Sequence, residues 1–294
     1  MGRICLDRNE SEGVDNVMSA QQQMAEAEQA SSARYAKYVL FVLIIVYIFN
    51  FIDRQILSIL AEEIKADLGI GDAEIGFLYG TAFAVFYAVF GIPLGRLADM
   101  WNRKKLISMG LSFWSLMTAL SGFAQNFGSL AFCRFGVGVG EASATPAAFS
   151  MLSDYFSPKV RATVLAIYSS GIYLGSGIGL FLGGAIVHTW HGWYPDPTLA
   201  PLGIKAWQAA FLAVGIPGIF MAIWVWTLRE PVKGASEGIL TPQRPAPFQA
   251  AGKSLMSVLP GFSIVSLYVA GGLRAVIINL IVGTLIGLLF YGLY

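Results

Sequence analysis

The stretch FNFIDRQILSIL, residues 49–60, places two charged side chains inside an apolar run. Residues 38–52 contain only Asn50 as a strongly polar side chain, and Asp53 and Arg54 follow directly. A charge at mid-membrane costs roughly 2.5–3.5 kcal/mol on insertion scales, so such residues face the protein interior or a water-filled cavity. The stretch therefore predicts a membrane helix with one polar side that faces inward.

The whole chain has the composition of a protein that crosses the membrane several times. Of its 294 residues, 56% are hydrophobic and 13% are charged, whereas soluble domains contain about 25% charged residues. The predicted fold class is all-α, a polytopic membrane helix bundle. Runs long enough to span a bilayer as helices are expected at 37–61, 74–98, 105–125, 127–152, 163–187, 207–228 and 275–294.

Polar segments divide the chain into four expected parts. Residues 1–36 form a disordered cytoplasmic N-terminus, 37–228 a six-helix bundle, and 229–253 a Pro-containing cytoplasmic linker. Residues 254–294 hold a segment that lies on the membrane surface or begins the seventh span, followed by that span. Lys and Arg gather before the first run and after the second, fourth and sixth, which predicts a cytoplasmic N-terminus.

Two more charged residues, Arg134 and Glu141, lie within the fourth run. With Gly138 they fall at i, i+4 and i+7, so they share one stripe of a helix. At a rise of about 1.5 Å per residue, Asp53 lies about 24 Å from the inner end of its span, and Arg134 about 10 Å from the outer end of an oppositely directed helix. In a core about 30 Å thick these levels nearly coincide, so an Asp53–Arg134 pair is possible, with Glu141 nearer the cytoplasm.

These buried charges allow two interpretations. In the first, they form a static ion pair that locks two helices together. In the second, a titratable carboxylate binds and releases protons, and its partner arginine switches between the acid and a substrate. Glu141 has no adjacent base on its own helix, and a desolvated carboxylate that is paired only part of the time suits proton coupling. The candidate proton-coupling or substrate-binding residues are Asn50, Asp53, Arg54, Arg134 and Glu141.

The segment GIPLGRLADMWNRKK, residues 91–105, carries the first resemblance to a known family. Its Gly–Asp–basic spacing resembles the signature between the second and third helices of the major facilitator superfamily. Asn102 matches the DxxNRK form of the spinster-like branch, whereas Met100 replaces a common basic residue. We expect Gly95 to permit close helix approach, Asp99 to cap a helix, and the basic residues to bind the inner leaflet. The candidate gating residues are Gly95, Asp99, Asn102, Arg103 and Lys104.

Three further segments extend this resemblance over residues 37–231. NFIDR (50–54) resembles the spinster-like N-x-x-D-R, RFGVGVGEA (134–142) resembles RxxxGxGEA, and FLAVGIPGIFMAIWVWTLREP (211–231) resembles the family's sixth helix. The resemblance implies a fold of twelve helices in two six-helix halves, of which this chain holds the N-terminal half and about one extra helix. A missing C-terminal half or a second copy would then supply the opposing wall.

Glycines recur in the fourth and fifth runs. The segment GIYLGSGIGLFLGG (171–184) resembles the glycine-rich fifth helix of facilitator antiporters but lacks its usual proline. Small residues let membrane helices pack closely, whereas a nucleotide-binding role would need a preceding strand and an acidic ribose partner. The expected helix-packing glycines are Gly138, Gly140, Gly171, Gly175 and Gly179.

The resemblance implies a secondary active transporter that is proton-coupled and moves a lipid-like or organic-anion substrate by alternating access. The same scaffold serves drugs and sugar acids in bacteria, and a non-transporting scaffold protein is the alternative. The implied partners are a small-molecule or lysolipid-like substrate, protons and membrane lipids, without nucleic acid. The implied location is the bacterial inner membrane. Aromatic residues that could line the cavity, or simply pack, are Tyr79, Phe83, Phe86, Tyr87, Tyr168 and Tyr173.

Enzymatic and metal-dependent functions have little support in the sequence. Cys5 and Cys133 are far apart, and His188 and His191 have no acidic or cysteine partner at ligand spacing. No Ser–His, Cys–His or metal constellation falls within the spans. We therefore expect no enzyme activity, no cofactor and no metal site.

Overall fold

The computed structural model describes residues 32–237, 246–259 and 262–292, and these contain helices and loops but no strand. The first helix is Ser32–Ile59. The further helices are α2 (Ala61–Leu68), α3 (Asp72–Gly76), η1 (Phe77–Thr81), α4 (Ala82–Met100), α5 (Arg103–Ser121), α6 (Phe127–Glu141), α7 (Ala144–Tyr155), α8 (Pro158–Ser169), α9 (Gly171–Trp193), η2 (Pro197–Leu199), η3 (Pro201–Gly203), α10 (Ala206–Trp226), η4 (Ala235–Glu237), α11 (Pro247–Val258) and α12 (Phe262–Gly292).

Five of the described helices are long and apolar enough to cross a membrane. They correspond to the first, second, fifth, sixth and seventh expected runs, and they are Ser32–Ile59, Asp72–Met100, Pro158–Trp193, Ala206–Trp226 and Gly271–Leu288. The third run is the 19-residue helix α5. The fourth, expected as one helix over 127–152, is divided between α6 and α7. Pro146 in the first turn of α7 accounts for the break, because proline has no N–H to bond to the carbonyl of Ala142 and its ring clashes with that carbonyl.

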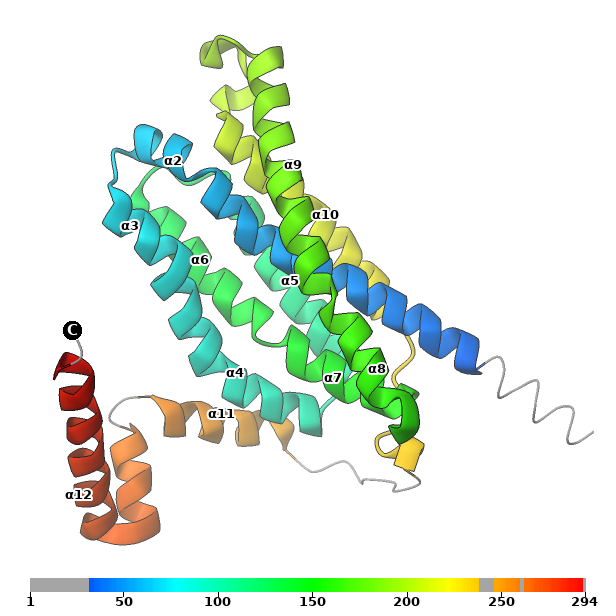
Figure 1. Cartoon of the computed structure of the whole chain (residues 1–294), viewed down its shortest axis with the longest axis vertical. Coiled ribbons are helices and arrows are strands. Elements are labelled where there is room, and N and C mark those ends of the chain that lie inside the picture. Colours follow the sequence, from blue (N-terminus) through cyan, green and yellow to red (C-terminus); the bar gives the residue numbers. More distant parts are fainter. Residues whose placement is uncertain (1–31, 238–245, 260–261, 293–294) are drawn as a thin grey trace, which may run out of the picture.

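The helices of the bundle pack around α5 and α6. Helix α10 lies along α5, while α6 lies between α5 and α4. Figure 1 shows the first helix (blue) passing behind α9, and α9 extending to the end of the molecule at which α2 lies. This arrangement brings the first helix, α5 and α6 together at mid-bundle, where the charged residues occur.

Two hydrophobic cores lie at the two ends of the bundle, with a polar layer between them. One core, near the turn between α4 and α5, includes Trp114 and Val137. The other, near α2, includes Ile56 and Trp207. Asp53, Thr118 and Arg134 are each buried. The helices of Asp53 and Arg134 each carry residues of both cores, whereas Thr118 lies on α5 between Trp114 of the first core and Ala124 of the second, which follows the helix. The charges therefore interrupt an otherwise continuous apolar interior.

The C-terminal part of the described chain stands beside the bundle. Helix α11 packs against the end of α4, and α12 follows it, as Figure 1 shows. Gly272 in α12 has φ +65°, which breaks the helix into two pieces. Within the expected linker over 229–253, residues 247–253 are helical and belong to α11. The expected disordered segment lies largely outside the described residues, but its residues 32–36 are helical.

Candidate functional site

The centre of the bundle holds a group of charged and polar side chains that we call the mid-bundle charge layer: Asp53, Arg54, Thr118, Arg134 and Glu141. Asp53 on the first helix is 2% exposed and accepts a hydrogen bond from Nη1 of Arg134 on α6, at 3.2 Å. The Thr118 hydroxyl on α5 donates to the other oxygen of Asp53. Three helices are thus joined at one carboxylate.

A second ion pair lies beside the first. Nε of Arg54 is 2.7 Å from Oε2 of Glu141, which is fully buried. The Arg54 guanidinium also lies over the rings of Phe51, Phe83 and Tyr87, at 4.9, 4.5 and 5.1 Å from their centroids. Because 27% of the Arg54 side chain remains exposed, this arginine reaches from the buried carboxylate of Glu141 to the accessible surface of the described chain.

Several polar atoms of this region lack a partner among the described residues. They are Oδ1 of Asn50, Nε of Arg134 and Oε1 of Glu141. A buried polar atom without a hydrogen bond costs roughly 1–3 kcal/mol. The mid-bundle charge layer therefore has unused hydrogen-bonding capacity for a ligand, a water molecule or a rearranged side chain.

The structure brings together the two residues that the depth argument placed at one level, Asp53 and Arg134. Sequence reasoning missed the Arg54–Glu141 pair, because Glu141 lies two helical turns from Arg134 and has no adjacent base on its own helix. The missed signal is the adjacency of Asp53 and Arg54, which point about 100° apart on their helix. Thr118 was also missed, since a lone threonine in an apolar run carries no charge signal.

The turn between α4 and α5 carries a second set of charges, the Arg103 cluster: Arg103, Ser150, Asp154, Glu230 and Pro231. Arg103 is fully buried, and its Nε is 2.7 Å from Oε1 of Glu230. Nη1 bonds to Asp154 and to both oxygen atoms of Ser150 at 3.2 Å, and Nη2 donates to the carbonyl of Pro231 at 2.7 Å. Every nitrogen of this guanidinium is used.

The roles expected for the other gating residues change in the structure. Two side chains cap the start of α5. Glu230 accepts hydrogen bonds from the backbone amides of Arg103 and Lys104 at 3.1 and 2.9 Å, and Oδ1 of Asn102 accepts one from the backbone amide of Lys105 at 3.0 Å. The cap does not come from Asp99, whose backbone carbonyl instead accepts a hydrogen bond from Lys233. Sequence reasoning missed Glu230 because it lies more than 120 residues away.

The expected anchoring of the basic residues to lipid is wrong for two of them. Arg103 is buried in its cluster. Nζ of Lys104 donates to the carbonyls of Trp226 and Leu228 at 3.2 and 2.6 Å, and so satisfies the C-terminus of α10. These residues join helices, because the end of α10 supplies acceptors that local sequence does not reveal.

The glycines differ in how closely other helices approach them. A Cβ at Gly138 would lie 2.6 Å from the carbonyl oxygen of Phe83, and one at Gly175 would lie 2.6 Å from that of Ile48. A Cβ at Gly95 would lie 3.8 Å from its nearest neighbour, which is ordinary contact. Close helix approach, expected at Gly95, therefore occurs elsewhere. The remaining expected packing glycines also face tight contacts, at Gly140, Gly171 and Gly179.

The expected cavity-wall aromatics differ in their surroundings. Phe83 and Tyr87 stack on each other with centroids 5.4 Å apart and lie beneath Arg54. Tyr168 is buried and stacks on Tyr47 at 4.4 Å, which is a packing position. Tyr173 is 81% exposed on α9.

Comparison with known proteins identifies the family. Residues 43–294 match the family model described as Major Facilitator Superfamily, and the chain belongs to this superfamily. It is 34% identical in sequence to the crystal structure of a bacterial homolog to the human lysosomal transporter Spinster, in an inward-facing and unoccupied conformation. The TM-score is 0.63, and the match covers 80% of this chain and 49% of that one.

Two curated relatives have more specific names. The chain is 35% identical over 173 residues to an MFS-type efflux pump of Mycolicibacterium smegmatis, covering 59% of this chain and 37% of the pump. It is 28% identical over 184 residues to a probable L-galactonate transporter of Escherichia coli, covering 62% of this chain and 37% of that one. The chain thus spans well under half the length of these relatives. They are transporters, not enzymes.

Proposed function

We propose that this chain forms the N-terminal part of a proton-coupled secondary transporter that moves an organic anion or a lipid-like molecule by alternating access. The observation that carries the proposal is the Arg54–Glu141 pair. A fully buried carboxylate holds an arginine that is 27% exposed, so one member can exchange a proton while the other meets a substrate. The family membership supports a transport role for the whole protein.

The coupling step follows from the charges of this pair. When Glu141 binds a proton, its oxygen loses the negative charge that holds Nε of Arg54 at 2.7 Å. The guanidinium then has donors free for an anionic group, and arginine suits carboxylates and phosphates because its donors form a planar fork. Loss of the proton restores the pair and expels the anion. Asp53 keeps its two partners, Thr118 and Arg134, and holds the helices in register.

The surroundings of Arg54 favour an amphipathic anion. Rings of Phe51, Phe83 and Tyr87 surround the guanidinium within about 5 Å, so an apolar portion of a substrate can lie on aromatic surface while its acidic group meets the arginine. A lipid-like molecule with an acidic headgroup fits this description. A sugar acid offers the acidic group alone, and the similarity to a probable L-galactonate transporter of Escherichia coli supports this second class.

Transport by the full-length protein in vesicles tests the coupling role. The probes are L-galactonate and a lysophospholipid, each with and without a pH gradient. We expect Glu141→Gln to reduce gradient-driven uptake to the level of protein-free vesicles while exchange of substrate between the two sides continues. The control is Glu62→Gln, because Glu62 is 84% exposed and pairs with Lys65 away from the site. Gradient-driven uptake that survives in Glu141→Gln would refute the coupling step.

The alternative is a membrane scaffold in which both ion pairs are structural. Its support is that Asp53 and Glu141 each already have a cationic partner in one conformation. A scaffold predicts that neither probe crosses the membrane with the wild-type protein, and that Glu141→Gln lowers only the unfolding temperature. The same vesicles therefore distinguish the two functions.

We further propose that the protein lies in a bacterial inner membrane with a cytoplasmic N-terminus, and that the charge layer faces a second wall. Lys and Arg between the spans support the orientation. The wall would come from the rest of a longer protein or from a second copy. The intact mass of the protein expressed from its native locus distinguishes these sources, because this chain alone weighs 31.7 kDa.

A further inference from the structure

A pocket at the α2 end of the bundle has no role in the transport proposed above. It lies between α2, the end of α9 and the start of α10, and its volume is about 330 Å³. Its lining combines the aromatic residues Trp190 and Tyr194 with the carboxylates of Glu63 and Asp67. Ligand pockets are commonly about 300–1,000 Å³ in volume, so this one suits a small group.

The aromatic side of the pocket is held in place by named contacts. Trp190 lies in the last turn of α9, and Tyr194 directly follows the helix. Their ring centroids are 5.0 Å apart, and their ring planes meet at 49°. The indole Nε1 of Trp190 donates to the carbonyl of Ile204 at 3.1 Å, which fixes the ring against the start of α10. The two rings thus form an angled, fixed aromatic surface rather than a mobile one.

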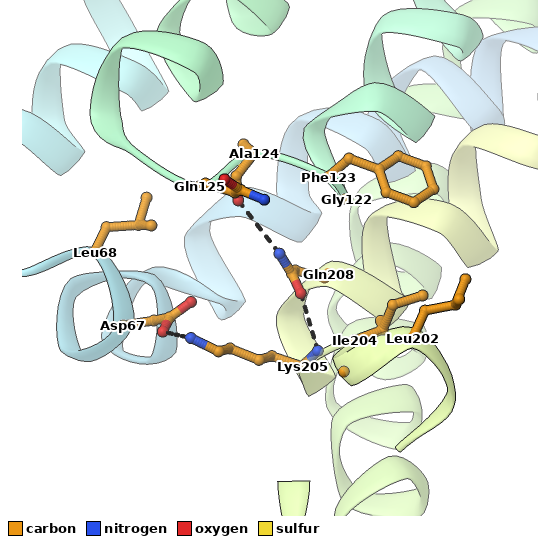
Figure 2. Close-up of a pocket in the computed structure, with 11 residues that line it drawn as sticks. Asp67, Leu68, Gly122, Phe123, Ala124, Gln125, Leu202, Ile204, Lys205 and Gln208 are labelled. Atoms are coloured by element: carbon orange, nitrogen blue, oxygen red, sulfur yellow. Dashed lines mark hydrogen bonds and ion pairs between the residues drawn. The ribbon is translucent and has the colours of Figure 1, made fainter. Parts of the chain in front are cut away.

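The charges of the pocket do not balance. Asp67 is paired with Lys205, as Figure 2 shows, and it accepts a hydrogen bond from the indole of Trp207 at 2.9 Å. Among the described residues, the one basic side chain within 4 Å of the Glu63 carboxylate is His191, whose Nε2 is 3.8 Å away. Asp67 and Lys205 offset each other in formal charge, so Glu63 is the acidic residue of the pocket without a Lys or Arg partner in the described part of the chain.

The ligand class follows from this combination. Among the described residues, no group of three or more His, Cys, Asp or Glu could hold a metal ion, so a bare cation is poorly suited. A substituted ammonium group carries one positive charge on an apolar, methylated surface, and such groups bind to aromatic faces through cation–π attraction. We propose that this pocket binds a quaternary ammonium group, with its methyl groups on Trp190 and Tyr194 and its charge beside Glu63.

The shared chemistry has two possible sources, free choline-like solutes and the choline headgroups of lipids. The pocket lies at the end of helices that are long and apolar enough to cross a membrane, so both can reach it. Saturation-transfer NMR on the full-length protein in a detergent without a choline group tests the first source. Vesicles of phosphatidylcholine, compared with phosphatidylglycerol, test the second through the increase in unfolding temperature.

The probe for the first arm is choline, and its neutral isostere 3,3-dimethyl-1-butanol is the ligand control. We expect choline methyl signals to show saturation transfer and the neutral alcohol to show little. Glu63→Gln should weaken choline binding at least about tenfold, since it removes the remaining charge. Glu62→Gln is the matched control and should bind choline as the wild type does, because Glu62 points to solvent and pairs with Lys65.

Each outcome decides the matter. Loss of choline binding in Glu63→Gln but not in Glu62→Gln, at equal unfolding temperatures, supports the site. Stabilisation by phosphatidylcholine that depends on Glu63, without binding of free choline, assigns the site to lipid headgroups. Equal binding of choline and its neutral isostere, unchanged binding in Glu63→Gln, or no response to either source would overturn it. None of these readouts involves substrate transport, so a failure of the quaternary-ammonium site and a failure of the proposed transport function are separate results.

Discussion

The mid-bundle charge layer and the Arg103 cluster are both built from arginines and carboxylates, but they use their hydrogen-bonding groups differently. Arg103 bonds through every guanidinium nitrogen and is fully buried. At mid-bundle, Nε of Arg134 and Oε1 of Glu141 have no partner among the described residues. A fully satisfied network rigidifies a structure, whereas a partly satisfied one can accept a new partner. The comparison indicates a rigid joint at the α4–α5 turn and an exchangeable site at mid-bundle.

The largest expected effect on stability is at the Arg103 cluster. Arg103→Ala leaves Glu230 and Asp154 without their cation, and breaking a buried ion pair costs about 3–5 kcal/mol. The unfolding temperature of the purified full-length protein measures this loss. Arg161→Ala is the control, because Arg161 is 25% exposed and pairs with Glu237, which is 45% exposed, and exposed pairs contribute about 0–1 kcal/mol. Equal losses in the two variants would show that the cluster is no rigid joint.

A smaller effect is expected where α6 meets α4. Gly138→Ala places a Cβ 2.6 Å from the backbone carbonyl oxygen of Phe83. The ring of the same residue lies beneath the Arg54 guanidinium. Overpacking of this kind costs about 1–3 kcal/mol, and the displaced ring should also weaken transport. Gly95→Ala is the matched control, since its Cβ meets only ordinary contact at 3.8 Å. If Gly95→Ala is the more harmful change in thermal unfolding, the gating role of the α4 end exceeds that of the mid-bundle contact.

Thr118 gives a finer test of the mid-bundle charge layer. Thr118→Val keeps the shape but removes the hydroxyl that donates to Asp53, which should cost about 1 kcal/mol. Thr118→Ser restores the donor and should recover most of the loss in unfolding free energy. A Thr118→Val variant as stable as the wild type would mean that Arg134 alone is sufficient for Asp53.

The smallest effect is expected for the ion pair of Lys65 and Asp72, which joins α2 to the start of α3 and in which the Asp72 side chain is exposed. A hydrogen bond from Lys65 lowers the pKa of Asp72 below its ordinary value of 3.8. A carboxyl group whose pKa is lower in the folded state than in the unfolded state stabilises the fold at any pH above its unfolded-state pKa. This contribution is lost as the pH falls through its folded-state pKa. Asp72→Asn should therefore differ slightly from wild type at pH 7, and this difference should shrink as the pH falls below 3.8 and through the lowered pKa. A large difference at pH 7 in thermal unfolding would contradict the contrast between exposed and buried pairs.

The sequence predicted more of the helices than of their joints. Hydropathy located the apolar runs because each run reports its own environment, without reference to a partner. It failed at Pro146, where one predominantly apolar run forms two helices, since an average over 26 residues hides one helix-breaking position. It also did not reveal that residues 247–253, which have the composition of a linker, are helical and form part of α11 against α4.

By itself, the sequence determined that this protein is a bundle of membrane helices with charges at one depth, and that Asp53 and Arg134 can meet there. Only the tertiary structure decided that Arg54 takes Glu141, 87 residues away, and that Arg103 takes Glu230, 127 residues away. The reason is physical: hydrophobic pattern and helix rise are local quantities, whereas the choice among carboxylates depends on which helix packs against which. The pocket beside Glu63 has the same origin, because its walls come from three segments that meet only in the folded chain.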